Sequence, residues 1–98
     1  MTTAKRFYFD TPQVDKLQAF GLYDGVGVLS YGTFTNTSSE ISKITITLNG
    51  ADILFDYEVT AGANEVLPFN VALQAGDIVY IKQSVANAVN VSLNGSIG

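Results

Sequence analysis

The side chains of this sequence that could carry out acid–base chemistry are carboxylates, because histidine and cysteine are both absent. Asp56 and Glu58 stand two positions apart in a run with strand character, so alternation places them on one face. Glycosidases use a pair of carboxylates for catalysis, and two carboxylates on one face could form such a pair. They are also what keeps the solvent face of a strand soluble, and no sequence context here indicates a desolvated carboxylate. We therefore interpret the pair as surface charges.

Other catalytic and metal-binding patterns are missing as well. No Ser or Thr can be given a histidine base, no Ser-x-x-Lys pair occurs, and Gly25-Val26-Gly27 does not extend into a phosphate-binding loop. Aspartates stand beside turns, but no Asp-x-Asp-x-Asp calcium loop is present. These turn aspartates are Asp24, Asp52, Asp56 and Asp77. The sequence predicts a protein that is not an enzyme and has no cofactor or metal.

Composition narrows the class further. Ninety-eight residues suffice for one domain, and only 14% of them are charged, against roughly 25% in average soluble domains. The net charge of −4 disfavours binding to nucleic acid and to anionic membranes. Lysine, which is depleted at protein interfaces, occurs four times. The N-terminus lacks the apolar run of a signal peptide, so we expect synthesis in the cytoplasm. From the low content of charged residues and of lysine we expect a function through contact with other proteins.

Alternation of apolar and polar residues predicts about seven strands, spaced as in a sandwich. They cover residues 7–9, 26–34, 44–48, 53–59, 67–73, 78–82 and 89–93. Asn49-Gly50 between two of them is the signal of a tight hairpin turn. Pro68 indicates an edge strand, and Gly27 and Gly32 indicate a bulge or a close backbone approach. The expected fold is an all-β antiparallel sandwich, jelly-roll-like, with an Ig-like sandwich as the alternative.

Two further expectations concern the interior and the start of the chain. The residues expected in the core are Ile46, Phe55, Phe69, Val71, Ile78 and Val91. Residues 14–20 could form one or two helical turns, with Pro12 near their start. We expect one domain in which residues 1–24 form an N-terminal aromatic arm or first strand and turn, and residues 25–98 form the sandwich body.

The segment Lys5-Arg6-Phe7-Tyr8-Phe9 is the densest cluster of aromatic and basic residues. It is either a strand that closes one sheet or an arm that reaches a neighbouring subunit by strand addition, and the two are compatible. In a regular strand Phe7 and Phe9 share one side, and Arg6 and Tyr8 share the other. We predict that these five residues contact a partner.

Five tyrosines leave a sugar-binding module open as a rival function, because such modules stack aromatic rings on sugars. They are Tyr8, Tyr23, Tyr31, Tyr57 and Tyr80. Tryptophan is absent, and Tyr57 and Tyr80 fall into the strand alternation. That placement favours core or rim positions for both.

Several motifs resemble small β-sandwich structural proteins of tailed-bacteriophage virions. They are Asn36-Thr37-Ser38, Asn49-Gly50, Leu73-x-x-Gly76-Asp77 and Val89-Asn90-Val91. The resemblance covers about the last two-thirds of the chain; the first quarter departs from the pattern. It implies a virion structural protein without catalytic residues, whose role is capsid decoration, fibre or head–tail fitting. Among these we expect a capsid decoration (cement) protein that binds the major capsid protein or other virion proteins. It also implies a symmetric homo-oligomer, with a trimer favoured. The alternative is a carbohydrate- or receptor-binding module such as a fibre tip.

Overall fold

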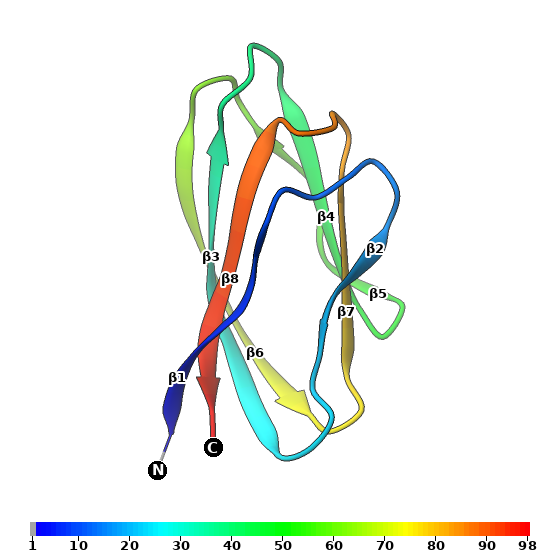
Figure 1. Ribbon diagram of the computed structural model, residues 1–98, viewed down its shortest axis with the longest axis vertical. Coiled ribbons are helices and arrows are strands. Elements are labelled where there is room, and N and C mark those ends of the chain that lie inside the picture. Colours follow the sequence, from blue (N-terminus) through cyan, green and yellow to red (C-terminus); the bar gives the residue numbers. More distant parts are fainter. Residues whose placement is uncertain (1) are drawn as a thin grey trace.

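The structure, a computed structural model, describes residues 2–98 as strands joined by turns. The strands are β1 (Thr3–Asp10), β2 (Leu17–Gly21), β3 (Val26–Asn36), β4 (Ser42–Leu48), β5 (Ala51–Val59), β6 (Asn64–Gln74), β7 (Ile78–Gln83) and β8 (Val89–Ile97). They form two four-stranded antiparallel sheets, seen on the left and right of Figure 1. Within residues 2–98 no helix is long and apolar enough to cross a membrane.

The strand order defines the fold. One sheet runs β1-β8-β3-β6 and the other β2-β7-β4-β5, so every connection except the β4–β5 hairpin crosses from one sheet to the other. Eight strands in two such interleaved sheets make a jelly roll. The prediction of an antiparallel jelly-roll sandwich is thus confirmed. The Ig-like alternative was wrong, because that fold joins several sequential strands as hairpins within one sheet.

The core lies between the sheets and is built from the inward side of each alternating strand. Ile46 and Val91 are fully buried, as predicted, while Phe69 and Val71 are half-buried because they lie on β6, the edge strand that Pro68 predicted. The fully buried apolar side chains are Leu29, Phe34, Ile44, Ile46, Val59, Val79, Val89, Val91 and Leu93.

The predicted β4–β5 turn is present. Asn49 and Gly50 both have positive φ, at 50° and 87°, as a tight hairpin of this type requires. The two glycines of β3 also sit at close approaches, because a Cβ on Gly27 would lie 2.9 Å from the Ser96 carbonyl oxygen and one on Gly32 2.8 Å from the Phe69 ring.

The prediction of helical turns at 14–20 was wrong. Part of this segment forms a strand instead, which is why there are eight strands where about seven were expected. Residues Leu17–Gly21 form β2, which pairs antiparallel with β7 from Leu17 opposite Ile81 to Gly21 opposite Ile78. A stretch this short carries too few apolar residues to separate the helical period from the strand period. Pairing with β7 decides in favour of the strand.

Two residues expected in the core are not there. Phe55 is 68% exposed, because two residues of β5, Phe55 and Asp56, stand opposite the single residue Thr45 of β4, and this bulge turns Phe55 outward. Ile78 lies outside the core because Val79 and Ile81 take the inward positions of β7. The continuous apolar run of β7 does not reveal which side of the strand is buried.

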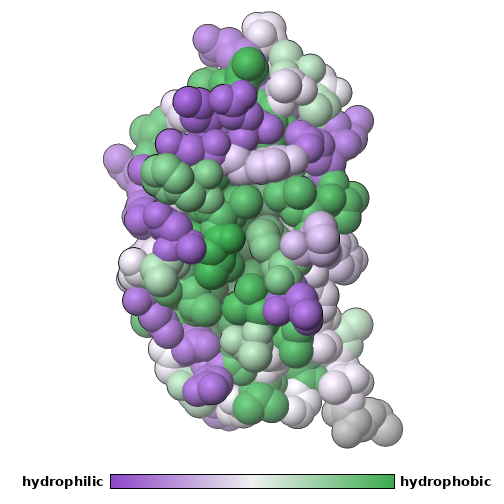
Figure 2. Space-filling model, turned by 180° about the vertical axis from the view of Figure 1, so that it is seen from behind, coloured by the Kyte–Doolittle hydropathy of each residue, from purple (hydrophilic) through white to green (hydrophobic). Residues whose placement is uncertain are grey.

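The sandwich is open along both sides. The edge strands β1 and β2 lie at the front of Figure 1, and the edge strands β5 and β6 lie at the back. Seen from behind, apolar surface runs down the middle of the molecule between hydrophilic flanks (Figure 2). The half-buried apolar side chains of β5 and β6 that pack against the core are Ile53, Leu54, Tyr57, Leu67, Phe69 and Val71. The core is therefore partly accessible from its sides.

Candidate interaction surface

The N-terminal segment is an edge strand of its own chain's sheet. Strand β1 pairs with β8 from Thr3 opposite Ile97 to Asp10 opposite Val91. This is the first of the two alternatives raised by the sequence, and it leaves the other edge of β1 free. The separation of residues 1–24 from 25–98 stays a prediction, although β1 and β2 are integral strands of the two sheets.

A bulge changes which side chains of β1 face outward. The register shifts between Arg6 and Tyr8, so Phe7 and Tyr8 both pack against the core. Phe9 is 68% exposed, and the Arg6 guanidinium carbon lies 5.2 Å from the centre of its ring. The regular alternation that grouped Phe7 with Phe9 was therefore wrong, because a bulge adds one residue and reverses the side on which the following residues lie.

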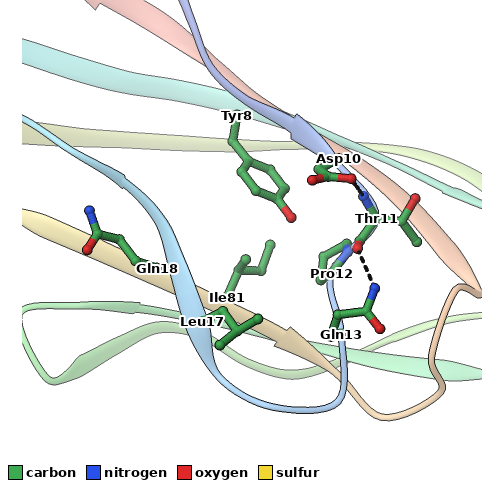
Figure 3. Close-up of a pocket in the computed structure, with 8 residues that line it drawn as sticks. All are labelled: Tyr8, Asp10, Thr11, Pro12, Gln13, Leu17, Gln18 and Ile81. Carbon is green, nitrogen blue, oxygen red and sulfur yellow. Dashed lines mark hydrogen bonds between the residues drawn. The ribbon is translucent and has the colours of Figure 1, made fainter.

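Tyr8 points into a cavity of about 170 Å³ between β1, the β1–β2 loop, β2 and β7 (Figure 3). Leu17 and Ile81 lie on the side of the cavity that belongs to the other sheet, and Asp10 lies beside the tyrosine. Burial, and secondarily the negative charge of Asp10, raises the pKa of Tyr8 to about 12. Tyr8 thus lines the cavity as a neutral hydroxyl beside the Asp10 side chain.

The β1–β2 loop that borders this cavity is held by a buried amide. The Nε2 group of Gln83 donates to the Pro12 carbonyl at 2.6 Å, and its Oε1 accepts from the Val89 N–H at 3.0 Å and the Ser42 hydroxyl at 2.9 Å. The backbone N–H of Gln83 donates to the Gln13 carbonyl at 2.9 Å. One side chain thus fixes the loop to both sheets, although its sequence context gave no signal of this role.

The outward face of the β1-β8-β3-β6 sheet, hereafter the neutral face, carries three rows of paired side chains. Each row crosses the sheet in register. The rows are Arg6-Asn94-Tyr31-Pro68, Phe9-Ser92-Thr33-Val66 and Asn90-Thr35-Asn64. Arg6 is the one charged residue in them, and the rest are amides, hydroxyls and apolar groups. Asn94 donates to the Ser92 hydroxyl at 3.0 Å, and the hydroxyls of Thr33 and Ser92 bond to each other.

The neutral face is hollowed near its N-terminal corner. The register of β1 with β8 and of β3 with both neighbours shifts at the same level of the sheet. Beside this line lies a hollow of about 270 Å³ with Ala4 and Gly95 among its small residues. Lys5, Arg6 and Tyr31 also line it, and Tyr31 is 43% exposed. The hollow combines two cations with an accessible aromatic ring.

The outward face of the other sheet is charged. Lys43 pairs with Glu58, and Lys82 lies opposite Thr45. Asp56 is fixed to Thr45, whose hydroxyl donates to the carboxylate at 3.3 Å and accepts the Asp56 N–H at 3.1 Å. The two faces thus differ in charge. One carries several charged side chains, which are disfavoured in the core of an interface, and the other carries almost none.

The remaining candidate residues do not assemble into a reactive site. Among residues 2–98 no three carboxylates come together in a way that could hold a metal ion. Asp77 accepts from the Gln74 N–H at 2.8 Å and from the Asn49 amide at 2.9 Å, so it secures a turn. The Tyr57 hydroxyl donates to the Glu65 carboxylate, which raises the pKa of that tyrosine. Tyr57 also packs on the edge of Phe34, a rim position of the kind predicted.

Comparison with known proteins identifies the class of fold. No protein-family model matches the sequence, and no curated protein matches it either. Among solved structures, a chain of the T13 viral particle of IBDV is similar, with a TM-score of 0.61 and 12% identity over 99% of this chain and 31% of the other. A chain of infectious bursal disease virus strain Gx is similar, with a TM-score of 0.53 and 16% identity over 99% of this chain and 32% of the other.

These similarities support the jelly-roll fold seen in the strand order. The protein spans about a third of the length of the viral chains that it resembles. Both chains come from a virus particle that is not a tailed bacteriophage, so the phage resemblance of the sequence motifs gains no support from them.

Proposed function

We propose that the protein is a non-enzymatic structural component of a virion, a decoration (cement) protein that binds the major capsid protein or other capsid subunits. It would be made in the host cytoplasm and work in the virion. The observation that carries the proposal is the jelly-roll fold, to which a chain of a viral particle is similar over 99% of this protein. Origin in a tailed bacteriophage is part of the proposal and rests on the sequence motifs alone.

The neutral face supports a role in protein–protein contact. Its amides, hydroxyls and apolar groups lose little side-chain entropy on burial and carry few charges to desolvate. Arg6, Tyr31 and Phe9 supply the arginine and aromatic groups that are enriched at binding hot spots. Of the five residues expected to contact a partner, Lys5, Arg6 and Phe9 are exposed and available for it, whereas Phe7 and Tyr8 are half-buried.

The working state that we propose is a homo-oligomer, with a trimer favoured, because cyclic symmetry uses each interface repeatedly. Static light scattering of the purified protein, alone and mixed with capsid shells of its virus, tests both parts. We expect a mass above that of the monomer, or occupancy on the shells. A monomer that leaves the shells bare would rule the proposal out.

A second candidate function is binding of a carbohydrate or receptor, as in a fibre tip. The hollow favours it, because Tyr31 is accessible there beside Arg6 and the Asn94 amide. A glycan array with the wild-type protein and Tyr31→Ala distinguishes the two functions. Binding of a glycan that is lost in the variant, without occupancy on shells, would favour this second candidate.

A further inference from the structure

Phe55 is an exposed aromatic side chain that a built-in distortion holds outward. The bulge of β5 places Asp56 at a φ of 47°, in the region that non-glycine residues avoid. Two hydrogen bonds between Thr45 and Asp56 stabilise the distortion, one donated by the Thr45 hydroxyl and one by the Asp56 N–H, and Phe55 beside them remains 68% exposed. Bulges of this kind commonly re-aim a side chain for function.

The strand that carries Phe55 is acidic. Strand β5 contains Asp52, Asp56 and Glu58, all exposed, and no basic residue. Asp52 and Glu58 lie three residues before and after Phe55. Lys43 of β4, opposite Glu58, and Lys82 of β7, opposite Thr45, are the basic neighbours. The three carboxylates of β5 exceed these two lysines by one negative charge.

The hollow of the neutral face has the complementary properties. Lys5 and Arg6 line it together with Tyr31, so it offers positive charge and an aromatic wall. Its volume of about 270 Å³ exceeds the roughly 150 Å³ of an engineered protein cavity that takes up benzene. A phenyl ring therefore fits the space, and flanking carboxylates fit the cations.

The two surfaces lie on different sheets. Strand β1 is an edge of one sheet, and β5 is the edge of the other sheet at the opposite side of the sandwich. A single molecule thus presents the acidic surface and the hollow to different neighbours. A contact between two different surfaces of identical subunits is heterologous, and a heterologous contact closes into a ring when its rotation allows.

We propose that a second copy of this chain docks Phe55 into the hollow formed by Ala4, Lys5, Arg6, Tyr31, Asn94 and Gly95. The acidic strand β5 of that copy then faces the positive charge of Lys5 and Arg6. This inference deepens the proposed function and rests on its homo-oligomer; it names the partner and both surfaces. The aromatic ring provides the apolar anchor, and the charge pairs set the orientation.

Sedimentation velocity over a concentration series tests the contact with two variants. Phe55→Ala removes the anchor and leaves the hollow intact, whereas Arg6→Glu reverses a charge of the hollow and leaves the anchor intact. Each variant alone should dissociate at least about tenfold more readily than the wild type. Tyr23→Ala is the matched control, because Tyr23 is an aromatic side chain that is 80% exposed elsewhere, and it should associate like the wild type.

The decisive sample is a mixture of the two variants. The intact hollow of Phe55→Ala accepts the intact Phe55 of Arg6→Glu, so we expect a one-to-one complex that grows no further. The inference would be overturned if the wild type and both variants associated equally, or if the two variants stayed apart when mixed. Either result would leave the proposed function standing. A wild type that neither self-associates nor binds shells contradicts the proposed function itself. Unchanged melting temperatures confirm that the variants are folded.

Discussion

The ring of Phe7 in β1 stacks on the ring of Phe20 in β2, with centroids 4.8 Å apart and planes inclined by 21°. The two strands belong to different sheets, so this pair joins the sheets along the open side where the chain begins. The N-terminal strand is consequently part of the sandwich, although its outer edge stays free for a partner.

Replacing Phe7 by alanine should therefore destabilise the fold. We expect a loss of about 3 kcal/mol in the free energy of unfolding, at the low end for a buried Phe because the ring is only half-buried. Phe9→Ala, the control, should cost less than about 1 kcal/mol, because it loses only an exposed contact with Arg6. Urea denaturation measures both, and equal losses would mean that the bulge in β1 is misplaced.

A second pair of substitutions tests the strand registers of β5 and β6. Phe69 packs edge-on against Phe34 with ring centroids 6.5 Å apart, so Phe69→Ala should cost about 3 kcal/mol through lost burial and a cavity. Phe55→Ala should change stability by less than about 0.5 kcal/mol, because Phe55 is exposed. The reverse order of the two effects in chemical denaturation would contradict the bulge that turns Phe55 outward.

Gly95 of β8 lies in close contact with the backbone of β3. A Cβ there would overlap the Val28 carbonyl oxygen, so Gly95→Ala must separate β8 from β3. We expect a loss of about 3 kcal/mol or more, the upper range for overpacking. Gly50→Ala is the control: its Cβ meets nothing within 4 Å, so only the positive φ of 87° opposes it, at about 1–2 kcal/mol. Thermal unfolding measures the loss of stability in both variants. A larger loss for Gly50→Ala than for Gly95→Ala would mean that β8 and β3 lie further apart.

Tyr8 predicts a loss of stability at alkaline pH. Its pKa is about 12 in the folded protein and about 10 in the unfolded chain, so the neutral hydroxyl is favoured by folding. The contribution is complete below pH 10 and is lost as the pH rises through 12, because the unfolded chain releases the proton first. Tyr8→Phe should lose less stability than the wild type over this interval in denaturation series. Parallel curves for the two proteins would show that Tyr8 titrates normally.

The sequence predicted the fold where alternation is strict and failed where the backbone departs from it. The sequence of strand β4 alternates regularly, so Ile46 could be assigned to the core from its spacing. The sides on which Phe55 and Phe9 lie were predicted wrongly, because each residue lies at or next to a bulge. A bulge is defined by how a strand pairs with its neighbour in the sheet. Local spacing carries no information about that pairing.

The interaction surface was predicted only in part for the same reason. The cluster at Lys5–Phe9 stood out by composition, but its neighbours in the hollow, Tyr31 and Asn94, come from β3 and β8. The neutral face as a whole depends on which strands are adjacent. Gln83 was missed because its partners at Pro12 and Val89 become neighbours only when the jelly roll closes. These features follow from topology, which alternation alone does not specify.

The central claim is that this jelly roll is a structural subunit of a virion. The most direct measurement is density-gradient purification of virus particles from cells that produce the protein, followed by quantification of this chain in the particle fractions. The account predicts that the chain co-sediments with the particles in a fixed ratio to the major capsid protein, and that Arg6→Glu lowers this ratio. A chain that stays at the top of the gradient as a free monomer, while intact particles band without it, would contradict the account.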